Sequence, residues 1–196
     1  YRYRDEENIV AELQMLHDDF GLTKVVFLDD IFTVNRKRQF RLTKKIKERG
    51  LQNKMTFTFQ GRGDNLKMDL ARELYSAGFK TCLFGIETGS EEMMKTIDKG
   101  ETVAELEEGI RVAKEVGMHV AGTYIFGLPG DTHEQRLESI RASERLGLNS
   151  VRYNNATPYP GTVLYKTAVE QGRLYNPGGM YENFLAVSAI TENPFK

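Results

Sequence analysis

The sequence is poor in cysteine, because Cys82 is the only one among its 196 residues. A single thiol excludes an internal disulfide framework and any metal site built from several cysteines of this chain. Long apolar runs are also lacking, since no stretch approaches the roughly twenty residues that a membrane-spanning helix needs. The N-terminal sequence YRYRDEEN has no hydrophobic core of a signal peptide. These absences predict a cytoplasmic protein with no membrane partner.

A large excess of one charge is missing too, because the net charge is −1. A nucleic-acid-binding module is usually clearly basic, so we expect no nucleic-acid partner. The basic run at 36–49 agrees with this expectation, because Phe40, Leu42 and Ile46 would leave its cations on the outer face of a helix. The length fits one domain. The chain begins with Tyr1 rather than methionine, which predicts a fragment of a longer protein.

Glycine residues mark a repeated pattern along the sequence. Five segments share one pattern, in which an amphipathic stretch ends in glycine plus a large apolar residue and a β-rich run follows. The glycines are Gly21, Gly50, Gly78, Gly117 and Gly147. Glycine just past a helix can take the left-handed backbone conformation that ends it, and the next apolar residue can pack back on the last turn. The pattern therefore predicts a repeating helix–strand unit.

Helix starts are marked as clearly as helix ends. Thr102 with Glu105, and Thr132 with Gln135, have the spacing of capping boxes. Capping side chains are also expected before the first and second helices, and apolar residues recur at core spacing within the helices. The caps are Asp5 and Asn35, and the core positions are Ile9, Leu13, Leu16 and Phe20 in the first helix and Leu106, Ile110 and Ala113 in the fourth.

Strands alternating with helices predict βαβ units and a parallel sheet. We expect an initial helix near 6–20, strands near 24–29, 54–60, 80–86, 119–126 and 150–155, and a last helix at 162–171. Because a helix comes first, the fold class we predict is α/β, a partial, open TIM-like (β/α) barrel of parallel strands whose first strand is missing. It would occupy residues 1–175, and 176–196 would be a C-terminal tail of uncertain structure. A flat doubly wound sheet is the alternative, but no Gly-x-Gly-x-x-Gly follows a strand.

Polar residues begin where each predicted strand ends, which is where parallel α/β folds bind ligands. The segment FLDDIFT places one of Asp29 and Asp30 toward the barrel mouth, and the other at the rim or capping a turn. Further strand ends carry Gln60 and Arg62, then Glu87, Thr88 and Ser90, then Gly127 and Asp131, then Asn154, Asn155, Thr157 and Tyr159. So many polar groups in one cleft need a ligand or each other.

Two of the loops that follow predicted strands are rich in glycine and proline. The segment GTYIFGLPGDTHE has two glycines around Leu128-Pro129, a turn that either only reverses the chain or lets the backbone approach a flat ligand such as a purine. In TPYPGT, Tyr159 either covers the site or packs under the rim. The histidines, His17, His119 and His133, are too dispersed for a shared metal ion, and Cys82 reads as a core residue.

Taken in order, five motifs resemble those of the radical S-adenosylmethionine enzymes: FLDDIFT, TFQGR, FGIETGSEE, GTYIFGLPGDT and TPYPGTVLY. The resemblance is to the branch that often carries an N-terminal cobalamin-binding domain and includes the anaerobic magnesium-protoporphyrin monomethyl ester cyclases. It implies an iron–sulfur oxidoreductase or methyltransferase that reductively cleaves S-adenosylmethionine to a 5′-deoxyadenosyl radical. It also implies a small-molecule substrate, an external electron donor, a [4Fe–4S] cluster and, in the whole protein, cobalamin as a candidate cofactor.

The resemblance also suggests roles for individual residues, although it assigns no catalytic residue. Asp29 or Asp30 would accept hydrogen bonds from the methionyl ammonium, Glu87 would contact the ribose hydroxyls, and Arg62 and Lys99 are candidates for the methionyl carboxylate. The adenine would lie against the fourth strand's exit, near Tyr159. The full expected cofactor-binding set is Asp29, Asp30, Gln60, Arg62, Glu87, Ser90, Lys99, Ile125, Phe126, Gly127 and Tyr159.

The sequence departs from the family pattern in one respect, and this limits the activity expected of the chain alone. The Cys-x-x-x-Cys-x-x-Cys loop that holds the cluster is absent, so the cluster ligands are expected outside this chain, which would be inactive alone. Two other classes stay open. One is a barrel enzyme binding Mg²⁺ through Asp29, Glu87 and Asp131, and the other is a nucleotide-binding module without catalysis.

Overall fold

The five repeat glycines all adopt left-handed backbone conformations in the computed structural model, which describes residues 3–174. Their φ angles are 67° at Gly21 and Gly50, 98° at Gly78, 91° at Gly117 and 57° at Gly147. A strand follows each glycine, as predicted. The strands are β1 (Lys24–Val26), β2 (Thr56–Gly61), β3 (Phe79–Glu87), β4 (His119–Phe126) and β5 (Ser150–Asn155).

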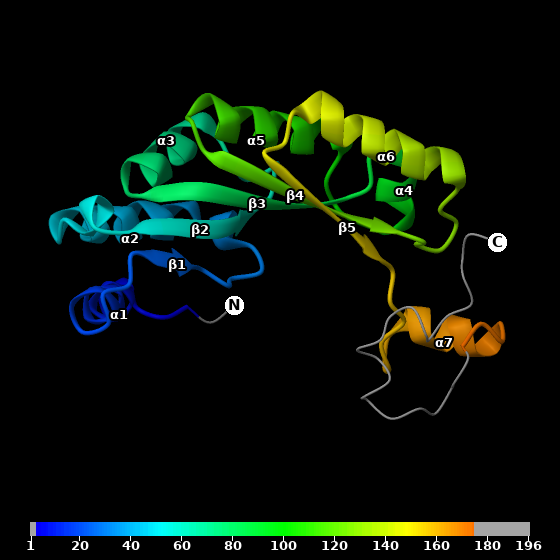
Figure 1. The fold of residues 1–196 in the computed structure, drawn as a ribbon, viewed down its shortest axis with the longest axis horizontal. Helices are drawn as coiled ribbons and strands as arrows, with labels where there is room; N and C mark the ends of the chain where they lie inside the picture. Colours follow the sequence, from blue (N-terminus) through cyan, green and yellow to red (C-terminus); the bar gives the residue numbers. More distant parts are fainter. Residues whose placement is uncertain (1–2, 175–196) are drawn as a thin grey trace.

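These strands form one sheet in the order β1-β2-β3-β4-β5, and every neighbouring pair is parallel. Sequential order with a helix in each connection is the arrangement of a (β/α) barrel, and the sheet curves without closing (Figure 1). The structure therefore confirms the open, partial barrel. Among the described residues, β1 and β5 are its two free edges.

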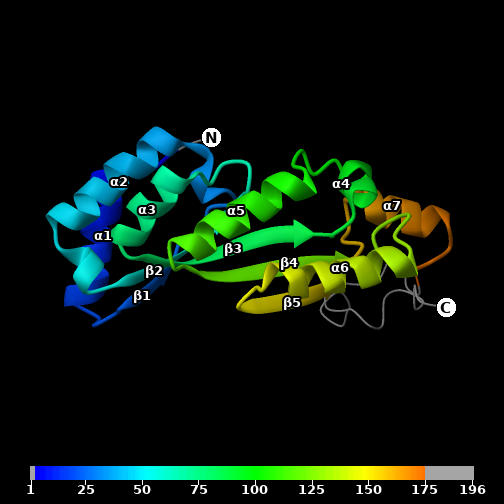
Figure 2. The same ribbon diagram turned by 90° about the horizontal axis from the view of Figure 1, so that it is seen from above.

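Helices cover the convex face of the sheet, except for the last helix, which lies beyond the end of β5, and the concave face is open between β1 and β5 (Figures 1 and 2). Both capping boxes are present, at Thr102 and at Thr132, and Asp5 and Asn35 cap their helices. No helix among residues 3–174 has the length and apolar character that a membrane crossing requires. The helices are α1 (Glu6–Asp18), α2 (Arg36–Glu48), α3 (Met68–Ser76), α4 (Glu91–Thr96), α5 (Val103–Glu115), α6 (His133–Leu146) and α7 (Val163–Glu170), with 3₁₀ turns η1 (Phe32–Val34) and η2 (Leu51–Asn53).

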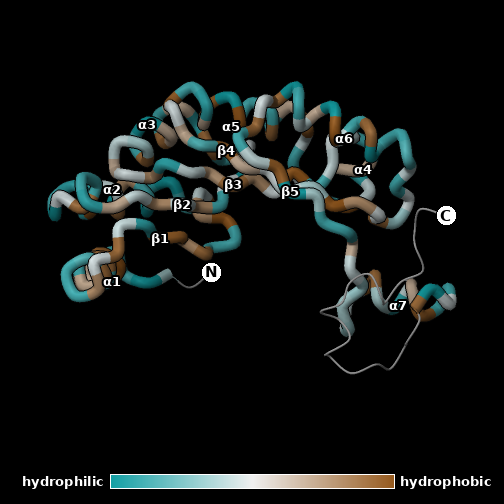
Figure 3. Tube along the Cα trace, in the orientation of Figure 1, coloured by the Kyte–Doolittle hydropathy of each residue, from teal (hydrophilic) through white to brown (hydrophobic). Residues whose placement is uncertain are grey.

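The core lies between the convex face of the sheet and helices α1 to α6, whereas Ala168 of α7 belongs to a separate small cluster. Alternate residues of β2, Phe57 and Phe59, are buried, and they pack with Phe32 and Phe79 at ring-centroid distances of 5.0 to 5.8 Å. In Figure 3 the helices alternate between hydrophobic and hydrophilic residues along their length, as helices with one buried face do. Cys82 is a fully buried core residue, as predicted.

Three local predictions were wrong, and one helix was not predicted. The first helix ends at Asp18, so Phe20 lies beyond it and is 67% exposed instead of buried. In α2, Arg38 is buried at 4% exposure, whereas Phe40 is at the surface. Strand β1 is three residues long, so Asp29 follows it in a loop. The short helix α4 was not anticipated at all, and the tail predicted at 176–196 lies outside the described residues.

The loop after β2 is seated on α5 by a contact between two glycines. A Cβ on Gly109 would overlap the backbone of Gly63, and a Cβ on Gly63 would overlap the backbone of Glu105 and Leu106. Neither glycine needs a positive φ, so the requirement is space alone. This contact sets the position of the neighbouring Arg62.

We expect Gly109→Ala to lower the free energy of unfolding by about 2–3 kcal/mol, because overpacking a backbone contact costs this much even though alanine favours the helix. Urea denaturation followed by circular dichroism measures the change. Ala104→Ser is the matched control, since Ala104 is exposed on the same helix, and its effect should stay within about 0.5 kcal/mol. A Gly109→Ala protein as stable as the wild type would show that the contact is loose.

Candidate active site at the strand exits

Because all five strands are parallel, their carboxyl ends meet at one edge of the sheet. Asp29, Glu87 and Gly127 follow or end β1, β3 and β4, so they lie at the same edge. The register places Glu87 beside Tyr124 of β4, and Ile125 beside Asn154 of β5. The ends of the strands, with Asp29, Glu87 and Gly127 among their residues, therefore share one mouth.

Glu87 is held in a strained conformation. Its φ is +66°, one of only two positive values at non-glycine residues of the described chain, and the pairing of β3 with β4 is irregular between Gly85 and Glu87. The Lys99 ammonium donates to the Gly85 carbonyl at 2.8 Å and to Glu87 Oε1 at 3.2 Å. A left-handed glutamate costs on the order of 1 kcal/mol or more, and such strain gathers at functional sites. The carboxylate is thus fixed over the end of β3.

Gly85 was missed by the sequence reasoning, although its signal was present as an isolated glycine within an apolar strand. A Cβ there would lie 2.7 Å from Glu87 Oε1 and 3.4 Å from Lys99 Nζ. The glycine therefore makes room on the concave face for this ion pair. Any larger side chain at this position would displace the carboxylate.

Arg62 ties β2 to the loop that carries Lys99. Its guanidinium bonds Asp64 at 2.9 and 3.1 Å, and it also donates to the Lys99 and Gly100 carbonyls at 3.3 and 2.7 Å. The hydrogen bond to Asp64 is the main reason that the pKa of Arg62 is raised. Asp98, the second residue with a positive non-glycine φ, directly precedes Lys99. The two cations predicted from the sequence therefore belong to one rigid network.

The loop after β4 is a tight turn closed by Asp131. The Gly127 amide donates to Asp131 Oδ2 at 2.9 Å, and Arg136 lies 3.5 Å from the same oxygen. The Asp131 side chain is 6% exposed, so it serves the loop and not an open coordination site. This arrangement leaves the Ile125–Gly127 backbone at the mouth with little side-chain cover.

A cavity of about 610 Å³ lies beside this loop, and it joins the exits of β4 and β5. It brings together two predicted residues, Ile125 and Tyr159, whereas Phe126 stacks on Tyr153 at 5.2 Å and does not line it. Apolar walls with a few amide groups suit a flat heteroaromatic ring. The lining residues are Ile125, Leu128, Tyr153, Asn154, Asn155, Ala156, Thr157, Tyr159 and Leu164.

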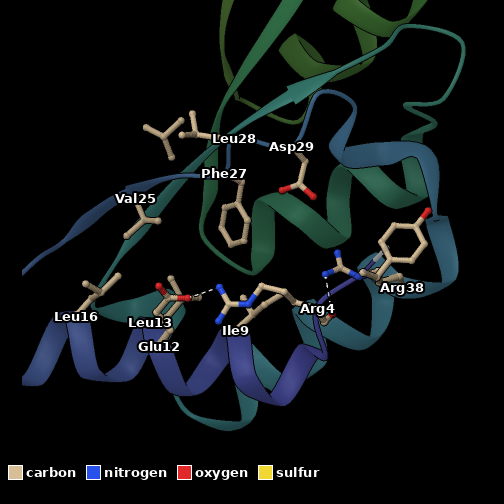
Figure 4. A pocket seen from close by; sticks show the side chains of 12 residues that line it. Arg4, Ile9, Glu12, Leu13, Leu16, Val25, Phe27, Leu28, Asp29 and Arg38 are labelled. Carbon is tan, nitrogen blue, oxygen red and sulfur yellow. Dashed lines mark hydrogen bonds and ion pairs between the residues drawn. The ribbon is translucent and has the colours of Figure 1, made fainter. Parts of the chain in front are cut away.

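A second cavity, of about 510 Å³, lies between α1 and the free edge of β1 (Figure 4). Phe27 points into the core, Leu28 is 88% exposed, and Asp29 faces the cavity. Asp30 is also exposed. In the described part of the chain, neither aspartate makes a hydrogen bond or an ion pair, so both carboxylates are available.

Two predicted residues lie elsewhere in the site. Gln60 faces the concave side of the sheet, in a pocket below the mouth. Ser90 is buried and caps α4 by accepting a hydrogen bond from the Met93 amide at 3.4 Å. Residues 3–174 contain no group of three or more His, Cys, Asp and Glu that could hold a metal ion. Burial raises the pKa of the Cys82 thiol, which disfavours the thiolate needed for ligation.

Comparison with known proteins bears directly on this site. The family model described as the Radical SAM superfamily matches residues 1–142. An uncharacterized methyltransferase of Pyrococcus horikoshii is 32% identical over 89% of this chain and 38% of its own length. The anaerobic magnesium-protoporphyrin IX monomethyl ester cyclase of Cereibacter sphaeroides is 26% identical over 90% of this chain and 29% of its own. The chain thus spans about a third of the length of these relatives.

Solved structures give the same fold. The radical S-adenosylmethionine methyltransferase TsrM of Kitasatospora setae superposes with a TM-score of 0.76 at 20% identity, over 86% of this chain and 33% of that one. The cobalamin-dependent radical enzyme OxsB gives a TM-score of 0.70 at 15% identity, over 97% of this chain and 34% of that one. Both likenesses confirm the open-barrel architecture.

Replacing a residue by glycine usually gives a less stable protein than replacing it by alanine. The strain at Glu87 predicts the opposite order at this position. We expect Glu87→Gly to be more stable than Glu87→Ala by about 1 kcal/mol, because both lose the carboxylate and only glycine tolerates φ of +66° without cost. Chemical denaturation of the two variants measures the difference. Lys95, exposed on α4, is the control, since there glycine should be less stable than alanine by about 1 kcal/mol. An alanine variant equal to the glycine variant at position 87 would contradict the strain.

Proposed function

The chain belongs to the radical S-adenosylmethionine superfamily, and from this premise we propose that it is the S-adenosylmethionine-binding part of an enzyme that cleaves this molecule reductively. The product would be a 5′-deoxyadenosyl radical that modifies a small-molecule substrate. One observation carries the assignment to this site. It is the strained Glu87 held by Lys99 at the mouth, one residue in register from the cavity that suits an adenine ring.

In this proposal each polar group binds a part of S-adenosylmethionine with complementary charge. The ribose hydroxyls donate to the Glu87 carboxylate, and the adenine lies in the cavity of Ile125 and Tyr159, against the Gly127 backbone. The exposed carboxylate of Asp29 or Asp30 accepts from the methionyl ammonium. Lys99 and Arg62 remain candidates for the methionyl carboxylate, and Gln60, Ser90 and Phe126 remain candidate contacts.

The residues of this chain do not fit a [4Fe–4S] cluster. Such a cluster takes several thiolates, and the sequence has one cysteine, which is buried in β3 with a raised pKa. We therefore propose that the thiolates come from another part of the whole protein. The free edge of β1 and the exposed Leu28 support this, because a further parallel strand along β1 would cover both. That strand would place a following loop beside Asp29.

The cluster would supply the electron, and this chain's residues would orient the sulfonium and exclude water. The relatives suggest methyl transfer or an oxidative reaction as the outcome, and cobalamin as a further cofactor of the whole protein. An external electron donor, no nucleic-acid partner and a cytoplasmic location complete the proposal. A reducing compartment suits cluster chemistry.

Neither competing class is favoured. A Mg²⁺ site would need Asp131, whose carboxylate is engaged by Gly127 and Arg136. A nucleotide-binding module without catalysis would use the same cavity. The match to the Radical SAM superfamily over residues 1–142 favours the radical enzyme instead. The proposed domain of 1–175 is the part of the barrel responsible for binding.

Binding of S-adenosylhomocysteine to this chain tests the site. We expect weak, saturable binding by NMR titration, with amide shifts at Gly85, Glu87 and Gly127, because the cluster that would hold the amino-acid end is absent. Glu87→Gln should weaken it about tenfold or more, since a charge-assisted hydrogen bond contributes about 1.5–3 kcal/mol. Glu115→Gln, an exposed change on α5, is the control. Equal affinity of all three proteins would remove Glu87 from the site.

Reconstitution tests the missing thiolates. When the purified chain is incubated anaerobically with iron and sulfide, we expect no visible absorbance of an iron–sulfur cluster, because the thiolates that ligate one are missing, and no cleavage of S-adenosylmethionine on reduction. A stoichiometric cluster that survives desalting would contradict the proposal. The Cys82→Ala chain is the control for nonspecific iron sulfide.

A further inference from the structure

The concave face of the sheet has a pocket of about 340 Å³, which Gln60 and Gly85 help to line. Its floor is made of small side chains on the inward positions of β3, β4 and β5. Pairing aligns Gly85 with Thr123, and Thr123 with Arg152, so these three form a row across the strands. The lining residues are Gln60, Leu83, Phe84, Gly85, Ala121, Gly122, Thr123, Ser150, Val151 and Arg152.

Arg152 is the charged group of this pocket. It makes no hydrogen bond or ion pair with any residue in the described range 3–174, and no carboxylate lines the pocket. Among the other polar side chains of the lining, Thr123 donates to the Phe84 carbonyl at 3.5 Å and Ser150 shares a hydrogen bond with His119 at 3.4 Å, whereas the Gln60 amide can donate to a ligand. A guanidinium is always charged and presents paired N–H groups to a planar or tetrahedral anion. The pocket therefore contains a cation that no carboxylate of its lining neutralises.

The pocket lies directly beside the proposed S-adenosylmethionine site. Gly85 belongs to both, because the Glu87 carboxylate and Lys99 ammonium lie over it. Two strand spacings of about 4.8 Å separate Gly85 from Arg152, so their Cα atoms are about 10 Å apart. That separation is the size of a small molecule seated between them. An anion bound at Arg152 would present the rest of its molecule to the adenosyl group.

We propose that Arg152 binds an anionic group of the substrate, a carboxylate or a phosphate. The proposal rests on the proposed function, and it adds the substrate class. The methionyl carboxylate is the other source of such an anion. It is disfavoured because Arg152 lies inside β5, three residues before its last residue Asn155, whereas Lys99 and Arg62 already lie at the mouth.

The test uses the whole chain labelled with ¹⁵N and titrated separately with inorganic phosphate, succinate and S-adenosylhomocysteine at constant ionic strength. We expect saturable shifts of the Thr123 and Arg152 amides and of the Arg152 Nε–H with phosphate or succinate, and the stronger of the two identifies the anion. Arg152→Gln should weaken this binding at least tenfold, and Arg152→Lys should restore only part of it. S-Adenosylhomocysteine affinity should change less than twofold in both variants.

Arg72→Gln is the matched control, because Arg72 is exposed on α3, away from the concave face. Chemical-shift changes that do not saturate with the anion, or that decrease equally in the Arg72 and Arg152 variants, would overturn the proposed anion site. A tenfold loss of S-adenosylhomocysteine binding in Arg152→Gln would also overturn the proposal, since the arginine would then hold the methionyl carboxylate. Saturable phosphate binding without any S-adenosylhomocysteine binding would refute the proposed function and leave the anion site standing.

Discussion

Everything in this molecule depends on the parallel pairing of five consecutive strands. Parallel pairing requires each connection to cross back over the sheet, and the left-handed glycines end each helix so that the next strand can begin at the same edge. Because every strand then leaves the sheet in one direction, residues from five distant segments gather at one mouth. A single antiparallel strand would have sent its polar exit to the opposite side.

The site at this mouth is organised by rigidity more than by the number of its charges. Glu87 is held in a costly backbone conformation, and its counter-ion Lys99 is itself fixed by the network around Arg62. Preorganised charges pay no reorganisation cost when a ligand arrives. The small residues on the concave face, Gly85 above all, keep the space that a ligand would need.

The sequence predicted the parts of this structure that depend on local chemistry. Helix caps and glycine stops need only neighbouring residues, so Thr102, Thr132 and the repeat glycines were placed correctly. Tertiary packing decided the rest. Arg38 is buried because the Arg4 carbonyl and the Tyr3 ring receive its guanidinium, contacts that span more than thirty positions of the chain. Likewise, Arg62 finds the Lys99 and Gly100 carbonyls of a distant loop, and the row that contains Arg152 follows from strand register, which periodicity alone does not specify.

Within residues 3–174 the sheet has two unpaired edges, and unpaired edges are templates for pairing between copies of a chain. The edge of β1 and the edge of β5 face opposite ways along the same parallel sheet, so the first of one copy can pair with the last of another. Head-to-tail addition of this kind continues indefinitely unless the rotation between successive copies closes a ring. A closed barrel removes both templates at once. Closing the barrel would therefore prevent open-ended polymerisation, in addition to enclosing a reaction space.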